Sequence, residues 1–159
     1  MTNAHVFNSN DTLRYITLKF RDEDVSKNAA IYKIDNDVDL ALLKCDEDLD
    51  LSPINFSDKN VKIGDECFNI ANQSNSDLNV SKGIISNPAI SMRYLSIENQ
   101  IFIEASIPIY PGSSGSPLLN NDYECIGVTT FRLKDQDSKP VTSYSYSIPS
   151  TKVKEFINL

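Results

Sequence analysis

Short runs in which apolar and polar residues alternate, each closed by turn residues, recur along most of this 159-residue chain. Because successive side chains of a strand point to opposite faces of a sheet, this period of two predicts β-strands with one buried face. The predicted strands are 12–20, 29–35, 39–45, 66–72, 80–86, 101–106, 124–133 and 143–149. Many short strands separated by turns favour an all-β sandwich or barrel over a doubly wound sheet.

Helical periodicity is convincing only at the end of the chain, in residues 149–159. Ser150 or Thr151 would serve as the N-cap of this helix. Its apolar face would be formed by Val153, Phe156 and Ile157. The acidic stretch 45–65 has no regular period and is predicted to cross the surface between two groups of strands.

Composition excludes several classes of protein. Hydrophobic residues make up 40% of the chain and charged residues 23%, which is enough apolar material for a core. The net charge of −7, without a basic cluster, argues against binding to nucleic acid. We find no apolar run long enough for a membrane span and no signal-peptide pattern in the chain as given, so the sequence assigns no compartment.

The cysteine and histidine content argues against a metal site or another cofactor. The three cysteines, an odd number at wide spacings, form neither a disulfide framework nor a metal-binding pattern. Cys67 and Cys125 lie inside apolar runs and are predicted to be buried. A single histidine, His5, makes a zinc site improbable.

The stretch 110–120, with the sequence YPGSSGSPLLN, raises a different question. Glycine, proline and serine dominate ordinary turns, so a surface turn is the simplest interpretation. The alternative is a loop that holds a reactive serine. Such a serine needs an imidazole to take its proton and a carboxylate to orient that imidazole. The one imidazole of the chain belongs to His5.

Three blocks answer that question by resemblance: Thr2–Val6 (TNAHV), Asp37–Lys44 (DVDLALLK) and Pro111–Leu119 (PGSSGSPLL). In this order they resemble the His, Asp and Ser blocks of trypsin-like serine peptidases, most closely the bacterial Deg-like branch. Weaker similarity between and after the blocks extends the resemblance over nearly the whole chain. It implies the all-β chymotrypsin fold, which has two six-stranded antiparallel β-barrels, together with a C-terminal α-helix.

The resemblance also divides the chain into parts of one peptidase domain. Residues 1–56 would form the N-terminal barrel with His5 and Asp39, residues 57–148 the C-terminal barrel with Ser114, and residues 149–159 the helix. Family members have about two strands before the His block, which here begins at residue 2, so the first barrel is expected to be incomplete. An open sheet edge of this kind would allow self-association.

Carried over position by position, the resemblance assigns the catalytic roles. Ser114 would be the nucleophile, His5 the general base and then general acid, and Asp39 the carboxylate that orients His5. The backbone N–H groups of Gly112 and Ser114 would form the oxyanion hole. A glycine suits position 112 because the loop must bend sharply while its amides turn toward developing negative charge.

Other residues compete for two of these roles. Asp37 lies two residues before Asp39 and would share its face of a regular strand, so it stays an alternative carboxylate. Ser113 and Ser116 are rival nucleophiles in principle, although Ser114 matches the reactive position of the family pattern. Ser116 stands where a glycine is common in the family.

The resemblance also indicates how a substrate would bind. The strand segment expected to pair with an extended substrate backbone is Thr129, Thr130 and Phe131. The floor of the specificity pocket would be formed by Ile107, Pro108 and Ile109. Because no carboxylate occurs there to pair with a basic side chain, we expect cleavage after small or medium apolar residues.

The sequence therefore predicts a serine endopeptidase that acts on polypeptides through a Ser-His-Asp triad and an acyl-enzyme. One alternative is a catalytically inactive β-barrel binding module descended from such a peptidase. Another is an esterase that does not cleave proteins.

Overall fold

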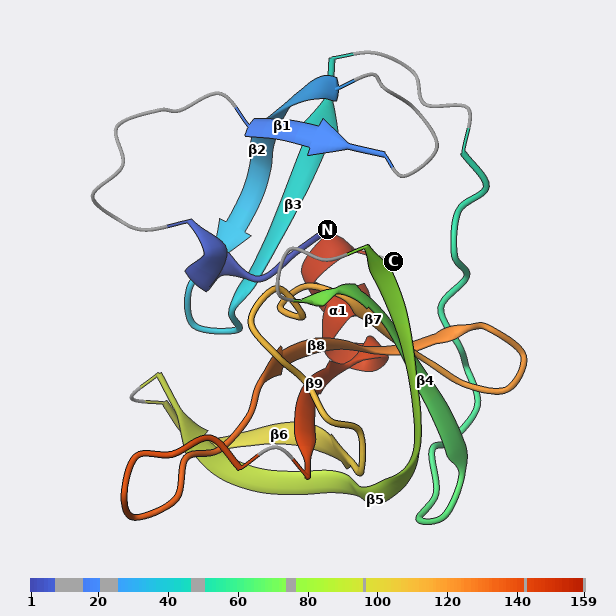
Figure 1. Cartoon of the computed structure of the whole chain (residues 1–159). Coiled ribbons are helices and arrows are strands. Elements are labelled where there is room, and N and C mark those ends of the chain that lie inside the picture. The colour runs from blue at the N-terminus through green and yellow to red at the C-terminus, as the bar shows by residue number, and fades with distance from the viewer. Residues whose placement is uncertain are drawn as a thin grey trace. The chain divides into compact units, whose positions relative to one another are not determined.

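The computed structural model describes residues 1–7, 16–20, 26–46, 51–73, 77–95, 97–141 and 143–158. The chain forms two compact units, Met1–Pro53 and Ile54–Leu159, which are taken one at a time below (Figure 1). Strands dominate both units, which confirms the predicted all-β class. In the described part, no helix has the length and apolar character needed to cross a membrane.

The first unit contains an antiparallel sheet in the order β1 (Ile16–Lys19), β2 (Ser26–Asp35) and β3 (Leu40–Cys45). A 3₁₀ turn, η1 (Ala4–Val6), precedes the sheet in sequence. Within the described ranges, β1 and β3 each pair with β2 on one side, and Thr2 forms an isolated bridge with Ala41. Self-association through these edges stays a prediction.

The turn between β2 and β3 is held by a carboxylate. Asp35 accepts hydrogen bonds from the backbone N–H groups of Asp37, at 2.9 Å, and Val38, at 3.0 Å. Asp39 closes the turn with φ of 63°, in the left-handed region. The strand begins at Leu40, one residue later than predicted, so the regular alternation that would place Asp37 and Asp39 on one face does not apply.

The second unit contains a closed antiparallel barrel with the strand order β4-β5-β6-β9-β8-β7. Its strands are β4 (Glu66–Asn72), β5 (Leu78–Tyr94), β6 (Ile97–Ala105), β7 (Pro117–Leu119), β8 (Cys125–Phe131) and β9 (Ser145–Pro149). The barrel interior is filled by apolar side chains whose inward positions follow the period of two. The central cluster is Cys67, Ile85, Ile103, Ala105, Ile107, Ile109, Leu118 and Ile126.

Both cysteines predicted to be buried are buried. Cys67 is fully inaccessible and belongs to the central cluster, and Cys125 is 5% exposed. Burial raises the pKa of the Cys67 thiol to about 12 and that of the Cys125 thiol to about 11. These thiols therefore stay protonated at neutral pH and act as small apolar groups.

The C-terminal helix α1 (Ser150–Ile157) is present, with Val153 and Phe156 buried, as predicted. The predicted cap is wrong: Pro149 occupies the N-cap position, without a side-chain hydrogen bond, and Ser150 is the first helical residue. Proline suits this place because it has no N–H that needs a partner. The helix ends at Asn158, which adopts the left-handed conformation that closes many helices.

Candidate active site

His5 and Asp39 are joined by two hydrogen bonds within the first unit. The ring atom Nδ1 of His5 lies 2.8 Å from Oδ2 of Asp39, and the backbone N–H of His5 donates to Oδ1 at 2.9 Å. Asp39 is fully buried, whereas the His5 side chain is 35% exposed. With a carboxylate as partner, Nδ1 carries the proton in the neutral ring, which leaves Nε2 as the basic nitrogen.

The backbone of Asp39 is held as well. Asn3, itself fully buried, donates its side-chain amide to the carbonyl of Asp39 at 3.0 Å. The left-handed backbone of Asp39 turns its side chain toward η1, where His5 lies. Of the two candidate carboxylates, Asp39 therefore contacts the imidazole, while Asp37 is exposed in the turn. That Asp39 acts in catalysis stays a prediction.

In the second unit, the serine loop, residues 110–116, forms two tight turns. Gly112 and Gly115 have φ of 95° and 84°. The backbone N–H of Ser113 donates to the carbonyl of Tyr110 at 3.0 Å. Ser114 is partly exposed, whereas Ser113 and Ser116 are buried. Of the three candidate nucleophiles, Ser114 is thus the one that the loop presents to solvent.

Glycine at 112 is required by space as well as by backbone conformation. A Cβ atom at this position would overlap the carbonyl oxygen of Asn72, at the end of β4. Residues with a side chain also rarely adopt φ near 95°, because Cβ then collides with the backbone.

Strand β8 is joined to the serine loop by hydrogen bonds. Thr129 donates its N–H to the carbonyl of Ser116 and accepts from the N–H of Gly115, both at 2.9 Å. The carbonyl of Thr130 accepts from the hydroxyl of Ser114 at 3.3 Å. Both main-chain polar groups of Thr129 are therefore bonded to the loop. Substrate binding by Thr129, Thr130 and Phe131 stays a prediction.

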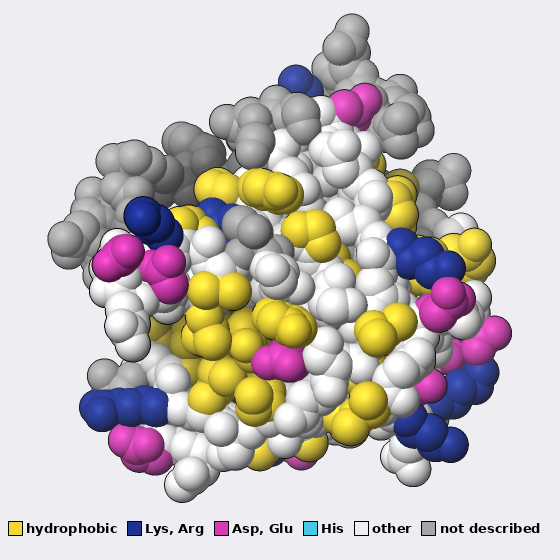
Figure 2. Space-filling view, turned by 60° about the horizontal axis from the view of Figure 1, so that its bottom comes forward, with side chains coloured by type: hydrophobic (Ala, Val, Ile, Leu, Met, Phe, Trp, Pro, Cys, Tyr) yellow, Lys and Arg dark blue, Asp and Glu magenta, His cyan; other side chains and the backbone are white. Residues whose placement is uncertain are grey.

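Phe131 belongs to a cluster of four aromatic rings. Its ring stacks on Tyr94, with centroids 4.4 Å apart, and on Tyr146, with centroids 5.0 Å apart, and Phe102 meets it edge-on. The hydroxyl of Tyr146 donates to Glu104 at 2.8 Å, and burial together with this bond raises the pKa of Tyr146. Figure 2 shows apolar side chains gathered on one face, with an acidic side chain among them.

The predicted pocket floor divides into buried and exposed parts. Ile107 and Ile109 are buried in the barrel, whereas Pro108 is exposed. Arg132, the residue after β8, donates from its guanidinium to the carbonyl of Ile109 at 2.8 Å and lies over the ring of Tyr110. A positive charge is thus fixed beside the predicted floor, at a residue for which no role was predicted.

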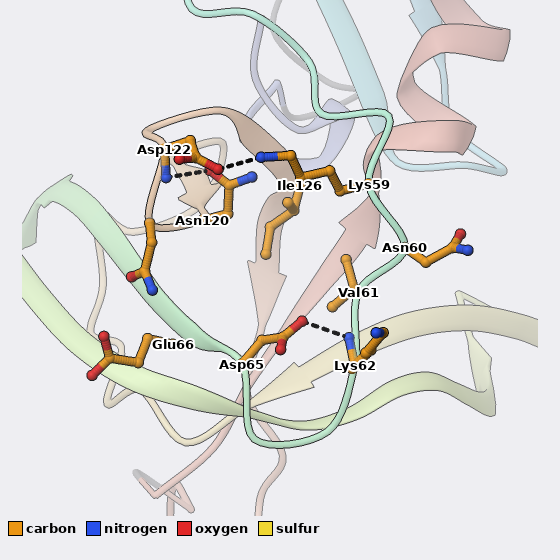
Figure 3. A pocket seen from close by; sticks show the side chains of 10 residues that line it. Lys59, Asn60, Val61, Lys62, Asp65, Glu66, Asn120, Asp122 and Ile126 are labelled. Atoms are coloured by element: carbon orange, nitrogen blue, oxygen red, sulfur yellow. Dashed lines mark hydrogen bonds and ion pairs between the residues drawn. The ribbon is translucent and has the colours of Figure 1, made fainter.

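A separate pocket of about 540 Å³ lies elsewhere on the second unit (Figure 3). It is lined by Lys59, Asn60, Val61, Lys62, Asp65, Glu66, Asn120, Asn121, Asp122 and Ile126. The amine of Lys59 pairs with Asp122, and Asp65 accepts from the backbone N–H of Lys62 at 2.8 Å. None of the predicted site residues lines it. The described residues also contain no group of His, Cys, Asp and Glu that could hold a metal ion.

Two residues at the site were not singled out by the sequence analysis. Asn3 lies inside the TNAHV block next to His5, so its place in that block was an available signal. Arg132 directly follows the predicted substrate-binding strand. Its contact with Ile109 depends on the closure of the barrel, which no local pattern encodes.

Comparison with known proteins places these features in a family. A closed antiparallel barrel with a tight serine loop, and a histidine bonded to a buried aspartate, are features of chymotrypsin-fold peptidases. Residues 1–128 match the family model described as a trypsin-like peptidase domain. The chain belongs to this family, as the three sequence blocks predicted.

Among its relatives, the chain is 28% identical over 162 residues to the serine protease Do-like HtrA of Lactobacillus helveticus, covering 99% of this chain. It is 30% identical over 160 residues to the protein of the same name from Bacillus subtilis, covering 97% of this chain. The alignments span only 38% and 34% of those two relatives. These similarities agree with the resemblance to the Deg-like branch.

Solved structures agree on the fold. An HtrA-type protease, AlgW with a decapeptide, has a TM-score of 0.82 and 28% identity, covering 99% of this chain and 46% of its own. An M. tuberculosis protease in its active form has a TM-score of 0.84 and 18% identity, covering 99% of this chain and 66% of its own. The latter similarity supports the fold alone.

Proposed function

We propose that this chain is a serine endopeptidase that cleaves polypeptides through Ser114, His5 and Asp39. The hydroxyl oxygen of Ser114 attacks the peptide carbonyl while Nε2 of His5 takes the hydroxyl proton. The N–H groups of Gly112 and Ser114 bind the oxygen on which negative charge develops. His5 then gives its proton to the departing amine, which leaves the acyl group on Ser114. A water molecule gives a proton to His5 as it attacks the acyl carbonyl, and His5 returns that proton to Oγ of Ser114 as the ester bond breaks.

The hydrogen bond between His5 and the buried Asp39 is the observation that carries this proposal. A buried carboxylate is costly unless it is well bonded, and this one accepts from both the ring and the backbone of His5. The arrangement fixes the tautomer that leaves Nε2 basic and stabilises the imidazolium that forms when Nε2 takes a proton. An ordinary structural histidine does not require this arrangement.

Catalysis also requires Nε2 of His5 to come within hydrogen-bond reach of the Ser114 hydroxyl, about 2.6–3.2 Å between heavy atoms. The two residues belong to different units. The proposal therefore requires these two atoms to lie within that reach when a substrate is bound.

The proposed substrates are polypeptides cut after small or medium apolar residues. Ile107 and Ile109 are buried in the barrel, Pro108 is the exposed apolar residue between them, and the guanidinium of Arg132 bonded to Ile109 would repel a lysine or arginine side chain. The register of β7 with β8 ends at Pro117 and Val128, and the main-chain groups of Thr129 are bonded to the serine loop, so we propose that an extended peptide pairs with the segment that follows Thr129. A related HtrA-type protease was solved with a decapeptide, which agrees with a peptide substrate.

A fluorophosphonate probe, which reacts with activated serines, tests the proposal on the 159-residue chain. We expect labelling that disappears in Ser114→Ala and falls in His5→Gln. Peptide mapping of the labelled protein would identify the serine, and a label on Ser113 or Ser116 would refute the assignment.

Two further results would select the alternatives. A chain that is folded by circular dichroism but takes up no label would favour the binding module. Cleavage of ester substrates without cleavage of any unstructured protein would favour the esterase. A peptide library cut mainly after arginine or lysine would overturn the predicted preference, even if the triad is correct.

A further inference from the structure

A buried polar network lies behind the serine loop, at an inward position of an otherwise apolar strand. The inward side chains of β4 are Cys67, Asn69 and Ala71. Asn69 is 1% exposed, and its side-chain amide donates to three oxygens on two other segments. These bonds reach Oγ of Ser116 at 2.7 Å, Oγ1 of Thr129 at 2.9 Å and the carbonyl of Pro117 at 3.2 Å.

The hydrogen bonds of this network do not satisfy every polar atom of the Asn69 side chain. Its Oδ1 atom is buried and has no hydrogen-bond partner among the described residues. An unsatisfied buried oxygen destabilises a fold, so an apolar residue at this place would suit the barrel better. The N–H groups of Asn69, rather than its packing, are therefore the feature that needs an explanation.

Ser116, the last residue of the serine loop, links Asn69 to the carbonyl of Ser113. Its hydroxyl, which accepts from Asn69, donates to the carbonyl of Ser113 at 2.6 Å. The backbone N–H of Ser116 donates to the same carbonyl at 3.1 Å. The carbonyl of Ser113 is thus held by two donors and directed into the buried side of the loop.

Orientation of that carbonyl fixes the orientation of the next amide. The peptide bond is planar, and no cis peptide occurs in the described residues, so the N–H of Ser114 points opposite to the carbonyl of Ser113. Ser113 is 1% exposed, whereas Ser114 is partly exposed. A carbonyl held inward therefore turns the N–H of Ser114 outward, where the proposed oxyanion would lie.

We infer that Asn69 is a positioning residue that, through Ser116, orients the backbone N–H of Ser114 as an oxyanion-hole donor. This inference rests on the proposed function. It assigns no contact with substrate to Asn69, which acts entirely through the bond chain from β4 to the peptide between Ser113 and Ser114.

The kinetic test uses Asn69→Ala, Ser116→Ala and the double variant, with Ser145→Ala as a matched control. Ser145 is a buried serine on β9 whose hydroxyl has no partner among the described residues. We expect kcat for peptide cleavage to fall by roughly 10- to 100-fold in each single variant, as for a small displacement of a catalytic group. KM should stay within about twofold, because the interaction matters in the transition state.

Three comparisons separate positioning from a merely structural role. The double variant should lose no more kcat than either single variant, because both act through one bond chain. Affinity for a peptide boronate, which forms a tetrahedral adduct at the serine, should fall in parallel with kcat. Ser145→Ala should keep kcat. Loss of thermal stability with unchanged kcat in Asn69→Ala would overturn the inference, and Ser116→Ala gives the same test if Asn69→Ala does not fold.

A readout without turnover distinguishes this inference from the proposed function. In ¹⁵N-labelled protein, the amide resonance of Ser114 should shift or broaden in Asn69→Ala and Ser116→Ala but stay in place in Ser145→Ala. An unmoved Ser114 resonance in both loop variants would refute the positioning role. A wild-type chain that neither reacts with fluorophosphonate nor cleaves substrate would refute the proposed function, while the resonance would still decide the orientation of the amide.

Discussion

Replacing Gly112 with alanine tests the serine loop, and the chain contains a matched control for it. Gly112 and Gly64 have nearly the same left-handed backbone, with φ of 95° and 87°. A methyl group at Gly64 would have no atom within 4 Å, whereas one at Gly112 would overlap the carbonyl of Asn72. The two substitutions therefore share backbone strain and differ in the collision.

The expected magnitudes follow from that difference. A side chain in the left-handed region costs about 1 kcal/mol, which for a chain of this size lowers Tm by about 2–4 °C. Gly64→Ala should show this loss alone, with kcat unchanged. Gly112→Ala should lose about 1–3 kcal/mol more as the loop or β4 moves to relieve the overlap. Because the N–H of Gly112 is a proposed oxyanion donor, the kcat of Gly112→Ala should also fall by about 100-fold or more.

Thermal unfolding followed by circular dichroism gives Tm, and initial rates on a peptide substrate give kcat and KM. The decisive comparison is between the two variants rather than with the wild type. If Gly112→Ala were as stable and as active as Gly64→Ala, the collision would have no consequence. The argument that position 112 must be glycine for reasons of space would then fail.

Three further outcomes are expected. Asp39→Asn should lower kcat by about 10³–10⁴-fold with little change in folding, because the side-chain amide cannot accept hydrogen bonds from both N–H groups of His5. Retained activity would contradict the proposed triad. Arg132→Glu should raise kcat/KM for substrates with lysine before the cut by at least about 10-fold relative to substrates with leucine there, since it replaces a like charge with an opposite one. An unchanged ratio in a peptide panel would show that Arg132 does not determine specificity. The free energy of unfolding should fall as pH rises from about 9 toward 12, because folded Cys67 holds a proton that the unfolded chain has lost, by at most about 1.4 kcal/mol per pH unit for this thiol. Urea unfolding of Cys67→Ala should show a shallower decline with pH, and an identical slope would exclude this thiol as a cause.

The sequence predicted those parts of the fold in which a local period is maintained. β4 alternates inward and outward residues through all of Glu66–Asn72, and its predicted range equals the observed one. β7 was missed because Pro117–Leu119 is too short to display a period. β5 was predicted only in part because its register shifts near Asn87 and Ile90, where bulges interrupt the alternation.

The candidate site, like the fold, could be predicted from the sequence only in part. The contact between His5 and Asp39 was anticipated only because two short blocks of sequence resemble those of a known family, since nothing local in either block encodes it. Arg132 and Asn69 could not be anticipated in this way. Their partners, Ile109 and Ser116, lie on other segments, and only the closed barrel determines which inward side chains meet.

The proposed machinery is assembled from two parts, each with its own bonds. His5 and Asp39 are fixed by contacts inside Met1–Pro53, and the serine loop is fixed by Asn69 and β8 inside Ile54–Leu159. A variant in one part should therefore leave the local structure of the other intact. Loss of catalysis in Asp39→Asn with an unmoved Ser114 amide resonance would then measure the imidazole alone. Loss of catalysis in Asn69→Ala would measure the oxyanion donor alone.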